Sequence, residues 1–198
     1  MPLLHKSKLR LVDLLESPQY YRGEVIYQKD NKFIPVPSRS FREAFELLTN
    51  DGEFSYFLHP VGSFGFVIDN DDLAANTQAI IPVMKLKLTP VIIGSESFMQ
   101  VSQLRIRESY GQSGIARNWY EHYVRSHHGI VSDCEHLAGG KLLWQSLIKS
   151  ADGPEFSVTL NSFTTGEKLM DVTSSTPESE IWSDDSSNKD KVLLFHIA

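Results

Sequence analysis

The stretch from Gln103 to Leu147 constrains the fold more than any other part of the chain. Apolar and polar residues alternate from Val101 to Ile106, which predicts a strand. A short polar loop follows, and from about Ile115 the apolar residues recur at helical spacing. We expect Gly129 to end this helix, a second strand to begin at Ile130, and a second helix to follow. This order of elements predicts a mixed α/β fold.

The loop between the first strand and the helix contains Gly111 and Gly114. The first turn of a helix leaves backbone N–H groups without internal partners, and the helix dipole favours negative charge there, so such an end suits phosphate. Glycine also lets a ligand approach the backbone closely, because it has no Cβ. The dinucleotide-binding and P-loop patterns are both absent. The loop therefore indicates either a phosphate site of another kind or a turn that needs glycine for its geometry.

The residues from Ile106 to Ala116, IRESYGQSGIA, resemble motif A of the GNAT acetyltransferase superfamily. In that motif a hydrophobic strand residue precedes a loop that ends in Gly-x-Gly/Ala and has a Tyr near its start. The later segment from Ser132 to Leu147 resembles the strand and helix that come next in the family. The resemblance implies a GNAT-like fold: a central, mostly antiparallel, twisted sheet with one parallel, splayed pair of strands, flanked by helices. The acyl-CoA-binding core would span residues 98–150.

The same resemblance implies that acetyl-CoA is the co-substrate, with an unidentified amine on a small molecule, a protein or a nucleobase as the acceptor. The pantetheine arm would bond to the backbone near Leu104 and Ile106. The pyrophosphate would lie on the backbone of the loop and the helix start, at Gly111, Gln112, Ser113, Gly114, Ile115 and Ala116.

The chain departs from the family pattern at two positions. The family usually has Arg or Gln three residues before the first Gly of Gly-x-Gly/Ala, whereas here that position is Gly111 and Gln112 comes one place later. A site made of backbone amides tolerates this change, because the side chain is not the main ligand. The helix aromatic, often a Tyr that protonates the leaving thiolate, is Trp144. Its indole N–H is not an acid near neutral pH, so another group or water would have to supply the proton.

Three residues are candidates for the chemistry of acetyl transfer, which needs a base for the amine and a proton for the thiolate. Glu108 could act as the base directly or through a water, and Tyr110 carries a phenol that could donate a proton. Asp133 follows the second strand, a place beside the thioester in the resembled fold. Each has a plainer interpretation: a solvated carboxylate for Glu108, core packing for Tyr110 and a helix cap for Asp133.

Other chemical groups give weaker signals. Cys134 and His136 are two residues apart, but no third group can be assigned to orient them. The single cysteine excludes an intramolecular disulfide and a zinc site built on several thiolates. The acidic turn from Asp69 to Asp72 lacks the Gly and the distal Glu of an EF-hand, so we expect Asp71 or Asp72 to cap a helix there. No metal is predicted.

Composition narrows the class of protein. The chain has 198 residues and a net charge of -6, which suits one domain and speaks against a protein whose main task is to hold nucleic acid. The N-terminal residues lack the apolar core of a signal peptide, and no run is long enough to cross a bilayer. We therefore expect a cytoplasmic protein without a membrane partner. A homodimer stays open.

The elements outside the central stretch are also predicted from patterns. Residues 1–53 form an N-terminal region with a helix from Leu9 to Glu16, a hairpin and a helix from Phe41 to Leu48 capped by Ser38 or Ser40. The arms of the hairpin are Glu24–Gln28 and Lys32–Val36. Further strands are expected at Phe54–His59, Gly65–Ile68, Ile80–Leu88, Phe156–Leu160 and, inserted in the sheet at the end of the chain, Val192–Ile197.

The segment from Asp171 to Asp190 is rich in Ser, Thr, Asp and Glu, which predicts a long acidic loop, disordered in part. Ile181 and Trp182 interrupt it and are expected to anchor it. An acidic, aromatic-anchored segment can mimic nucleic acid or dock on a basic surface. This supports an alternative: a catalytically inactive GNAT-like scaffold that binds a protein partner and counters host defence. Phage and mobile-element proteins offer an analogy for such a role.

Overall fold

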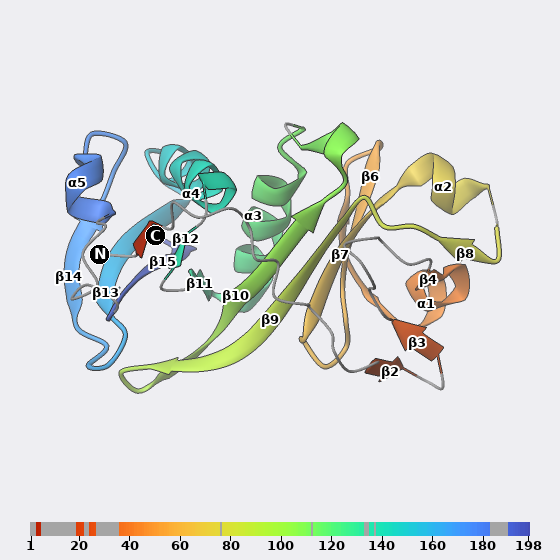
Figure 1. The fold of residues 1–198 in the computed structure, drawn as a ribbon, viewed down its shortest axis with the longest axis horizontal. Coiled ribbons are helices and arrows are strands. Elements are labelled where there is room, and N and C mark those ends of the chain that lie inside the picture. The colour runs from red at the N-terminus through yellow and green to blue at the C-terminus, as the bar shows by residue number, and fades with distance from the viewer. Residues whose placement is uncertain are drawn as a thin grey trace. The chain divides into compact units, whose positions relative to one another are not determined.

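The computed structural model describes residues 3–4, 19–21, 24–26, 36–75, 77–111, 113–132, 135–136, 138–182 and 190–198. The chain groups into two compact units. Unit 1 comprises Met1–Leu9, Thr89–Ser102 and Ala116–Ala198, and unit 2 comprises Arg10–Leu88 and Gln103–Ile115. Strands β9 (Met84–Ile93) and β10 (Glu96–Ile106) contribute residues to both units (Figure 1).

The sheet of unit 1 contains the one parallel pair in the main sheet of the described residues. Its strand order is β14 (Lys168–Val172), β13 (Phe156–Ser162), β15 (Lys191–Ile197), β11 (Gly129–Val131), β10. β10 and β11 are parallel, whereas β15 is antiparallel to both of its neighbours. The final strand is therefore inserted in the sheet, as its apolar composition predicts. A separate parallel pair joins β1 (Leu3–Leu4) to β12 (Glu135–His136).

The described helices of unit 1 are α3 (Ile115–His127), α4 (Ala138–Ser150) and α5 (Glu178–Ile181). The first residue of α3, Ile115, belongs to unit 2. The aromatic residues predicted for the core of α3 are buried. Trp119 is stacked on Tyr123 with ring centroids 5.0 Å apart. Tyr120 meets Trp144 of α4 edge to face at 6.1 Å, so burial of large aromatic surface holds the two helices together.

The end of α3 differs from the prediction. The helix ends at His127, and His128 takes the left-handed conformation (φ 66°) that closes a helix C-terminus. Gly129 is instead the first residue of β11. A Cβ at this position would lie 3.1 Å from the ring of Phe98 and 3.2 Å from the side chain of Leu194, so those side chains would have to shift to admit it.

Unit 2 contains an antiparallel set of strands, in the order β5 (Glu46–Asn50), β6 (Phe54–Leu58), β7 (Phe64–Asp69), β9. β10 follows β9 in the sheet order. The short strands β2 (Gln19–Tyr21) and β3 (Glu24–Ile26) pair with each other, as do β4 (Val36–Pro37) and β8 (Ala79–Ile80). The helices are α1 (Ser38–Glu43) and α2 (Asn70–Ala74).

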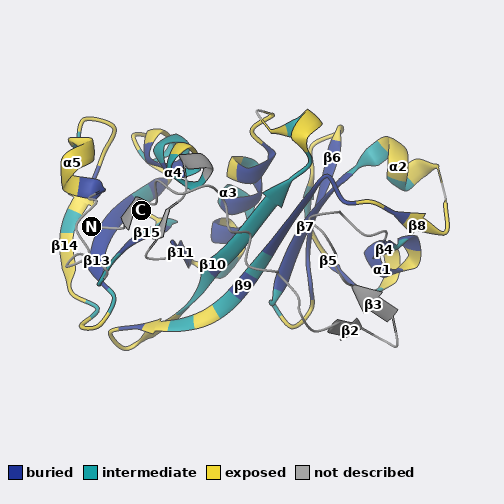
Figure 2. Cartoon of the chain, in the orientation of Figure 1, coloured by how far each residue is buried: buried dark blue, intermediate teal, exposed yellow. Residues whose placement is uncertain are grey.

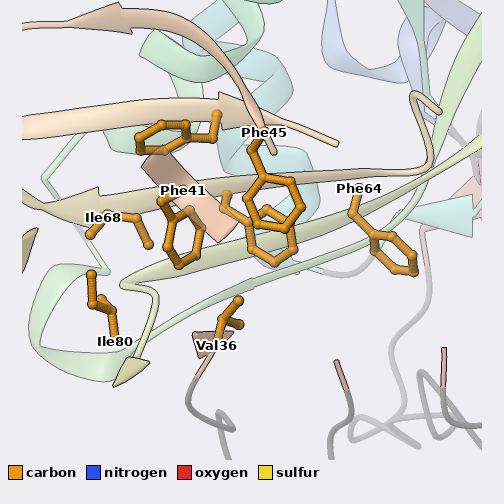
Figure 3. Close-up of a cluster of buried hydrophobic side chains, with 8 residues drawn as sticks. Val36, Phe41, Phe45, Phe64, Ile68 and Ile80 are labelled. Atoms are coloured by element: carbon orange, nitrogen blue, oxygen red, sulfur yellow. The ribbon is translucent and has the colours of Figure 1, made fainter. Parts of the chain in front are cut away.

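The core of unit 2 is an aromatic cluster on one face of β6 and β7. Phe41 and Phe45, in and just after α1, pack on Phe57 and Phe66 of these strands, with Phe45 stacked on Phe66 at 5.1 Å (Figure 3). Figure 2 shows β6 and β7 buried along most of their length. Alternate residues of each strand face this cluster, as the period-two geometry of a strand requires.

Two predictions for the N-terminal region are wrong. The helix expected at Phe41–Leu48 is α1, which ends at Glu43, and Leu47 and Leu48 lie in β5, where pairing with β6 overrides helical spacing. Neither serine caps α1, because Pro37 occupies the N-cap and the Ser38 hydroxyl donates to the carbonyl of Thr77 instead.

The predicted hairpin is also different, since the described partner of β3 is β2. Residues 27–35, which hold its expected turn, and the expected helix Leu9–Glu16 lie outside the described residues. The strands expected at Phe54–His59, Gly65–Ile68 and Phe156–Leu160 are confirmed as β6, β7 and β13. Pro82 separates β8 from β9 within the run predicted from Ile80 to Leu88.

The predicted fold class, a mixed α/β sheet that is mostly antiparallel with one parallel pair, is confirmed for the described residues. The sequence predicts one domain, and within the chain the contacts group the residues into two compact units. None of the described helices has the length and apolar character needed to cross a membrane.

Candidate functional site

The candidate loop follows β10 directly and lies in unit 2 up to Ile115. β10 ends at Ile106, a single 3-10 turn, η1, spans Glu108–Tyr110, and α3 begins at Ile115. The expected strand, loop and helix are therefore all present at the predicted places. Gln112 lies outside the described residues.

The first half of this loop uses its backbone N–H groups internally. The amide of Gly111 donates to the carbonyl of Glu108 and the amide of Ser113 donates to that of Tyr110, both at 3.2 Å. The Ser113 hydroxyl donates to the same Tyr110 carbonyl at 2.7 Å. Gly111 has an ordinary φ of -60°, so its conformation does not require glycine. These two amides are already committed to the turn.

The second half of the loop leads into the start of α3. The backbone N–H groups of Gly114, Ile115 and Ala116 have no hydrogen-bond partner within the part of the chain that the structure describes. Gly114 has a φ of 77°, a conformation that glycine adopts without strain. No acidic side chain lies in the first turn of α3. Gly114 is exposed, whereas Ile115 and Ala116 are only 1% and 6% exposed. The positive end of this thirteen-residue helix favours an anion, and Gly114 is the most accessible of the three donors.

Tyr110 is tied to the neighbouring elements of unit 2. Its hydroxyl donates to a carboxylate oxygen of Asp69 at 3.1 Å, and its ring packs edge to face on Phe54 at 5.8 Å. Arg107 lies over the same ring at 5.3 Å. Burial, together with the hydrogen bond to the Asp69 carboxylate, raises the pKa of Tyr110. A phenol held in this way is a weaker proton donor than a free one.

Asp69 also corrects the interpretation of the acidic turn. Its carboxylate accepts from the amide of Asp71 at 2.9 Å and so caps α2, whereas the sequence favoured Asp71 or Asp72 as the cap. The described residues contain no cluster of three or more His, Cys, Asp or Glu side chains placed to hold a metal ion.

The remaining candidates occupy varied positions. Glu108 is exposed, and Leu104 and Ile106 are half-buried in β10. Asp133 and Cys134 lie outside the described residues. Trp144, the residue in place of the family's Tyr, is buried with its ring against Tyr120.

The parallel pairing of β10 and β11 is short. Its register joins Met99 to Ile130 and Gln100 to Val131. The next link is made by a side chain, because the Gln100 amide donates to the carbonyl of Ser132 at 2.8 Å. The amide of Ser132 donates to the carbonyl of Leu193 on β15 at 2.9 Å, and its hydroxyl accepts from the Leu193 amide at the same distance. Ser132 is thus bonded to β15 through its backbone and its hydroxyl, and to β10 through the Gln100 side chain.

The sequence analysis did not identify Lys85, which the structure makes chemically unusual. Lys85 is 7% exposed, and its amine lies 5.2 Å from the ring centroid of Phe64. Burial, helped by the charge of Arg105, lowers the pKa of Lys85 to about 8. The alternation in β9 places Lys85 and Lys87 on one face, which a sequence pattern assigns to solvent. The structure shows that Lys85 is buried instead, because Phe64 and Phe66 lie beside it.

Comparisons with family models, with curated proteins and with solved structures find no match for this chain. The function is therefore argued from the site alone.

Proposed function

We propose that this protein is an acyl-CoA-dependent N-acyltransferase of the GNAT type, which transfers an acetyl group from acetyl-CoA to an amine by direct attack in a ternary complex. The observation that carries the proposal is the set of three consecutive N–H donors at Gly114, Ile115 and Ala116, at the start of a helix with no acid in its first turn. A pyrophosphate is the part of acetyl-CoA that such donors would hold.

The connectivity around these donors supports the same proposal. β10, the loop, α3 and β11 form a parallel unit in the order that the family resemblance implies. β15 lies between β11 and β13, and the β10–β11 ladder gives way to a side-chain bond at Gln100. Leu104 and Ile106 of β10 are the candidates to bind the thioester arm through their backbone groups. We place the activity in the cytoplasm as part of this proposal.

In this proposal the chemistry rests on few side chains. Glu108 is exposed beside the loop and would accept the proton of the attacking amine, directly or through a water. Tyr110 has its hydroxyl proton directed at Asp69, so protonation of the thiolate by Tyr110 would require that bond to break. Asp133 stays a prediction, as does the identity of the amine acceptor.

Calorimetric titration with acetyl-CoA tests the donor set. We expect binding, and we expect Ala116→Pro to weaken it by about 10-fold or more, because one hydrogen bond to a charged group contributes roughly 1.5–3 kcal/mol. Proline is tolerated in the first turn of a helix, so the variant should fold, which circular dichroism would check. Gly111→Ala is the matched control, since the Gly111 amide already donates to Glu108. No heat at millimolar acetyl-CoA would remove the proposal.

A second candidate, a catalytically inactive GNAT-like scaffold that binds a protein partner, is favoured by the environments of Trp144 and Tyr110. The first is buried against Tyr120 and the second donates to Asp69, so neither is a ready acid. Acetyl-CoA binding without release of free thiol, over a panel of small amines and lysine peptides, would support this alternative. Thiol release with any acceptor would exclude it.

The acidic segment contributes less to this alternative than its composition indicates. Ile181 and Trp182 are buried, as predicted for an anchor, and the amine of Lys141 lies over the Trp182 ring at 5.1 Å. Glu178 accepts hydrogen bonds from Lys141 and Gln145 of α4. Glu178, Ile181 and Trp182 are therefore held against their own chain.

A further inference from the structure

A row of side chains crosses the sheet of unit 2 from an aromatic core to a pair of cations. The register places Phe57 of β6 opposite Phe66 of β7, and Phe66 opposite Lys85 of β9. Phe57, Phe66 and Lys85 thus share one face of the sheet. β10 follows β9 in the sheet order, and Arg105 on β10 lies close enough to Lys85 for its charge to act on the amine.

The environment of Lys85 disfavours a positive charge in three ways. Its side chain is buried next to Phe64 and Phe66, which removes water from the amine. Arg105 places a second positive charge beside it. Among the described residues no carboxylate or other hydrogen-bond acceptor contacts its amine. The rings of Phe64 and Phe66, whose centroids lie 5.2 and 6.0 Å from the Lys85 amine, can partly stabilise its positive charge.

A lysine in such surroundings keeps a substantial share of neutral amine at physiological pH. Because burial lowers its pKa to about 8, Lys85 carries roughly 200 times more neutral amine at pH 7.5 than a lysine with the ordinary value of 10.5. The neutral amine is the nucleophilic form. Desolvation in an apolar site and a neighbouring cation are the two devices that activate lysines for covalent chemistry with carbonyl compounds.

The exposure of the residues differs along the row. Phe66 is fully buried, Lys85 is 7% exposed, and Arg105 is half-buried. Exposure therefore rises along the row toward Arg105. The positive charge of Arg105, which lies close enough to act on the amine, favours a ligand that carries negative charge.

We propose that Lys85 is a covalent binding site for a small aldehyde or ketone that bears an anionic group, held by the row formed with Phe64, Phe66 and Arg105. The lone pair of the Lys85 nitrogen attacks the carbonyl carbon, and the electrons of the C=O π bond move to oxygen. A proton passes from nitrogen to that oxygen, and loss of water leaves an imine. The step needs no other reactant, and it is independent of the proposed acyl transfer.

Pyridoxal 5′-phosphate, an aldehyde with a phosphate, is the probe that tests this proposal. The protein is exposed to it briefly at pH 7.5, the imine is trapped with borohydride, and each labelled lysine is quantified by peptide mass spectrometry. We expect Lys85 to react at least about 10-fold faster than any other lysine, and pyridoxal, which lacks the phosphate, to react more slowly at Lys85. Equal rates with the two aldehydes would overturn the anionic part of the proposal.

Variants and pH separate the role of Lys85 from general reactivity. Lys85→Met should abolish the fast phase, and Lys87→Met, on the same strand and face, should retain it. The rate should rise with pH to a midpoint near 8, given the groups that face the amine: Arg105 from β10, the rings of β7 and, beyond Phe64, His59 at 6.2 Å. Labelling of Lys85 no faster than Lys87 in the unmodified chain would overturn the proposal, whether or not the variants fold.

Discussion

Two regions of unit 2 hold polar groups in opposite ways. The described residues of the loop from Glu108 to Gly114 are largely exposed, and the amides of Gly111 and Ser113 donate within the loop's own turn. The row of Phe66, Lys85 and Arg105 instead buries an amine against aromatic rings. In the loop, water reaches the polar groups, so changes there should cost little stability and act mainly on ligands. In the row, removal of water changes the chemistry of the group itself, and stability and reactivity become linked.

The largest expected difference between the two regions is in stability. Phe66→Ala removes a fully buried ring that packs on Phe41 and Phe45, so the free energy of unfolding should fall by about 3–5 kcal/mol. Ser113→Ala, which removes one exposed hydroxyl from the loop, should change it by no more than about 0.5 kcal/mol. Urea denaturation followed by circular dichroism measures both. Equal losses would show that the loop is part of the core.

The second expected effect is a pH dependence that belongs to Lys85. Its pKa falls from 10.5 to about 8 on folding, so between these values the unfolded chain binds more protons than the folded one. Stability therefore rises with pH across this window, and below pH 8 the buried amine costs the folded state about 3 kcal/mol. Lys85→Met should be more stable than the unmodified protein at pH 7, with an advantage that shrinks toward pH 10.5. An advantage that is constant over this range would contradict the assignment.

The smallest expected effect is the difference in stability between alanine substitutions at the two glycines of the loop. Gly114→Ala places a Cβ at a φ of 77° and should cost about 1–2 kcal/mol. Gly111→Ala should stay within about 0.5 kcal/mol, because its φ is -60° and a Cβ would lie 3.4 Å from the Glu108 carbonyl, an ordinary contact. Thermal unfolding of the two variants is the measurement. A larger loss for Gly111→Ala would mean that the geometry of the turn depends on the first glycine.

The central elements were predictable from sequence because their signals are local. Period-two alternation before Ile106 and helical spacing after Ile115 identified β10 and α3, and the aromatic residues of α3 are buried as expected. Signals that depend on partners failed. Leu47 and Leu48 match a helix by spacing, yet both lie in β5, where Leu47 pairs with Phe57 and Leu48 lies at a register shift. A strand partner is not encoded in a window of eight residues.

In the candidate site, too, local features were predicted from sequence, whereas features that depend on distant residues were not. The loop and its glycines were identified, but which of its amides are used internally depends on the turn that η1 makes. Tyr110 was expected to pack in the core, and its bond to Asp69 joins residues 41 positions apart. Lys85 gave no signal, since the alternation that contains it is the same for a solvated face and for a covered one.

By itself, the sequence of this protein determined the type and order of the central elements, the presence of a glycine-containing loop before α3 and the burial of its helix aromatics. These follow from periodicity and from backbone preferences that act over a few residues. Only the tertiary structure decided that the amides of Gly111 and Ser113 are used within the loop and that Lys85 is enclosed beside Phe64 and Arg105. The physical reason is that access of water to a group is set by residues distant in the chain, and hydration controls both hydrogen bonding and the pKa.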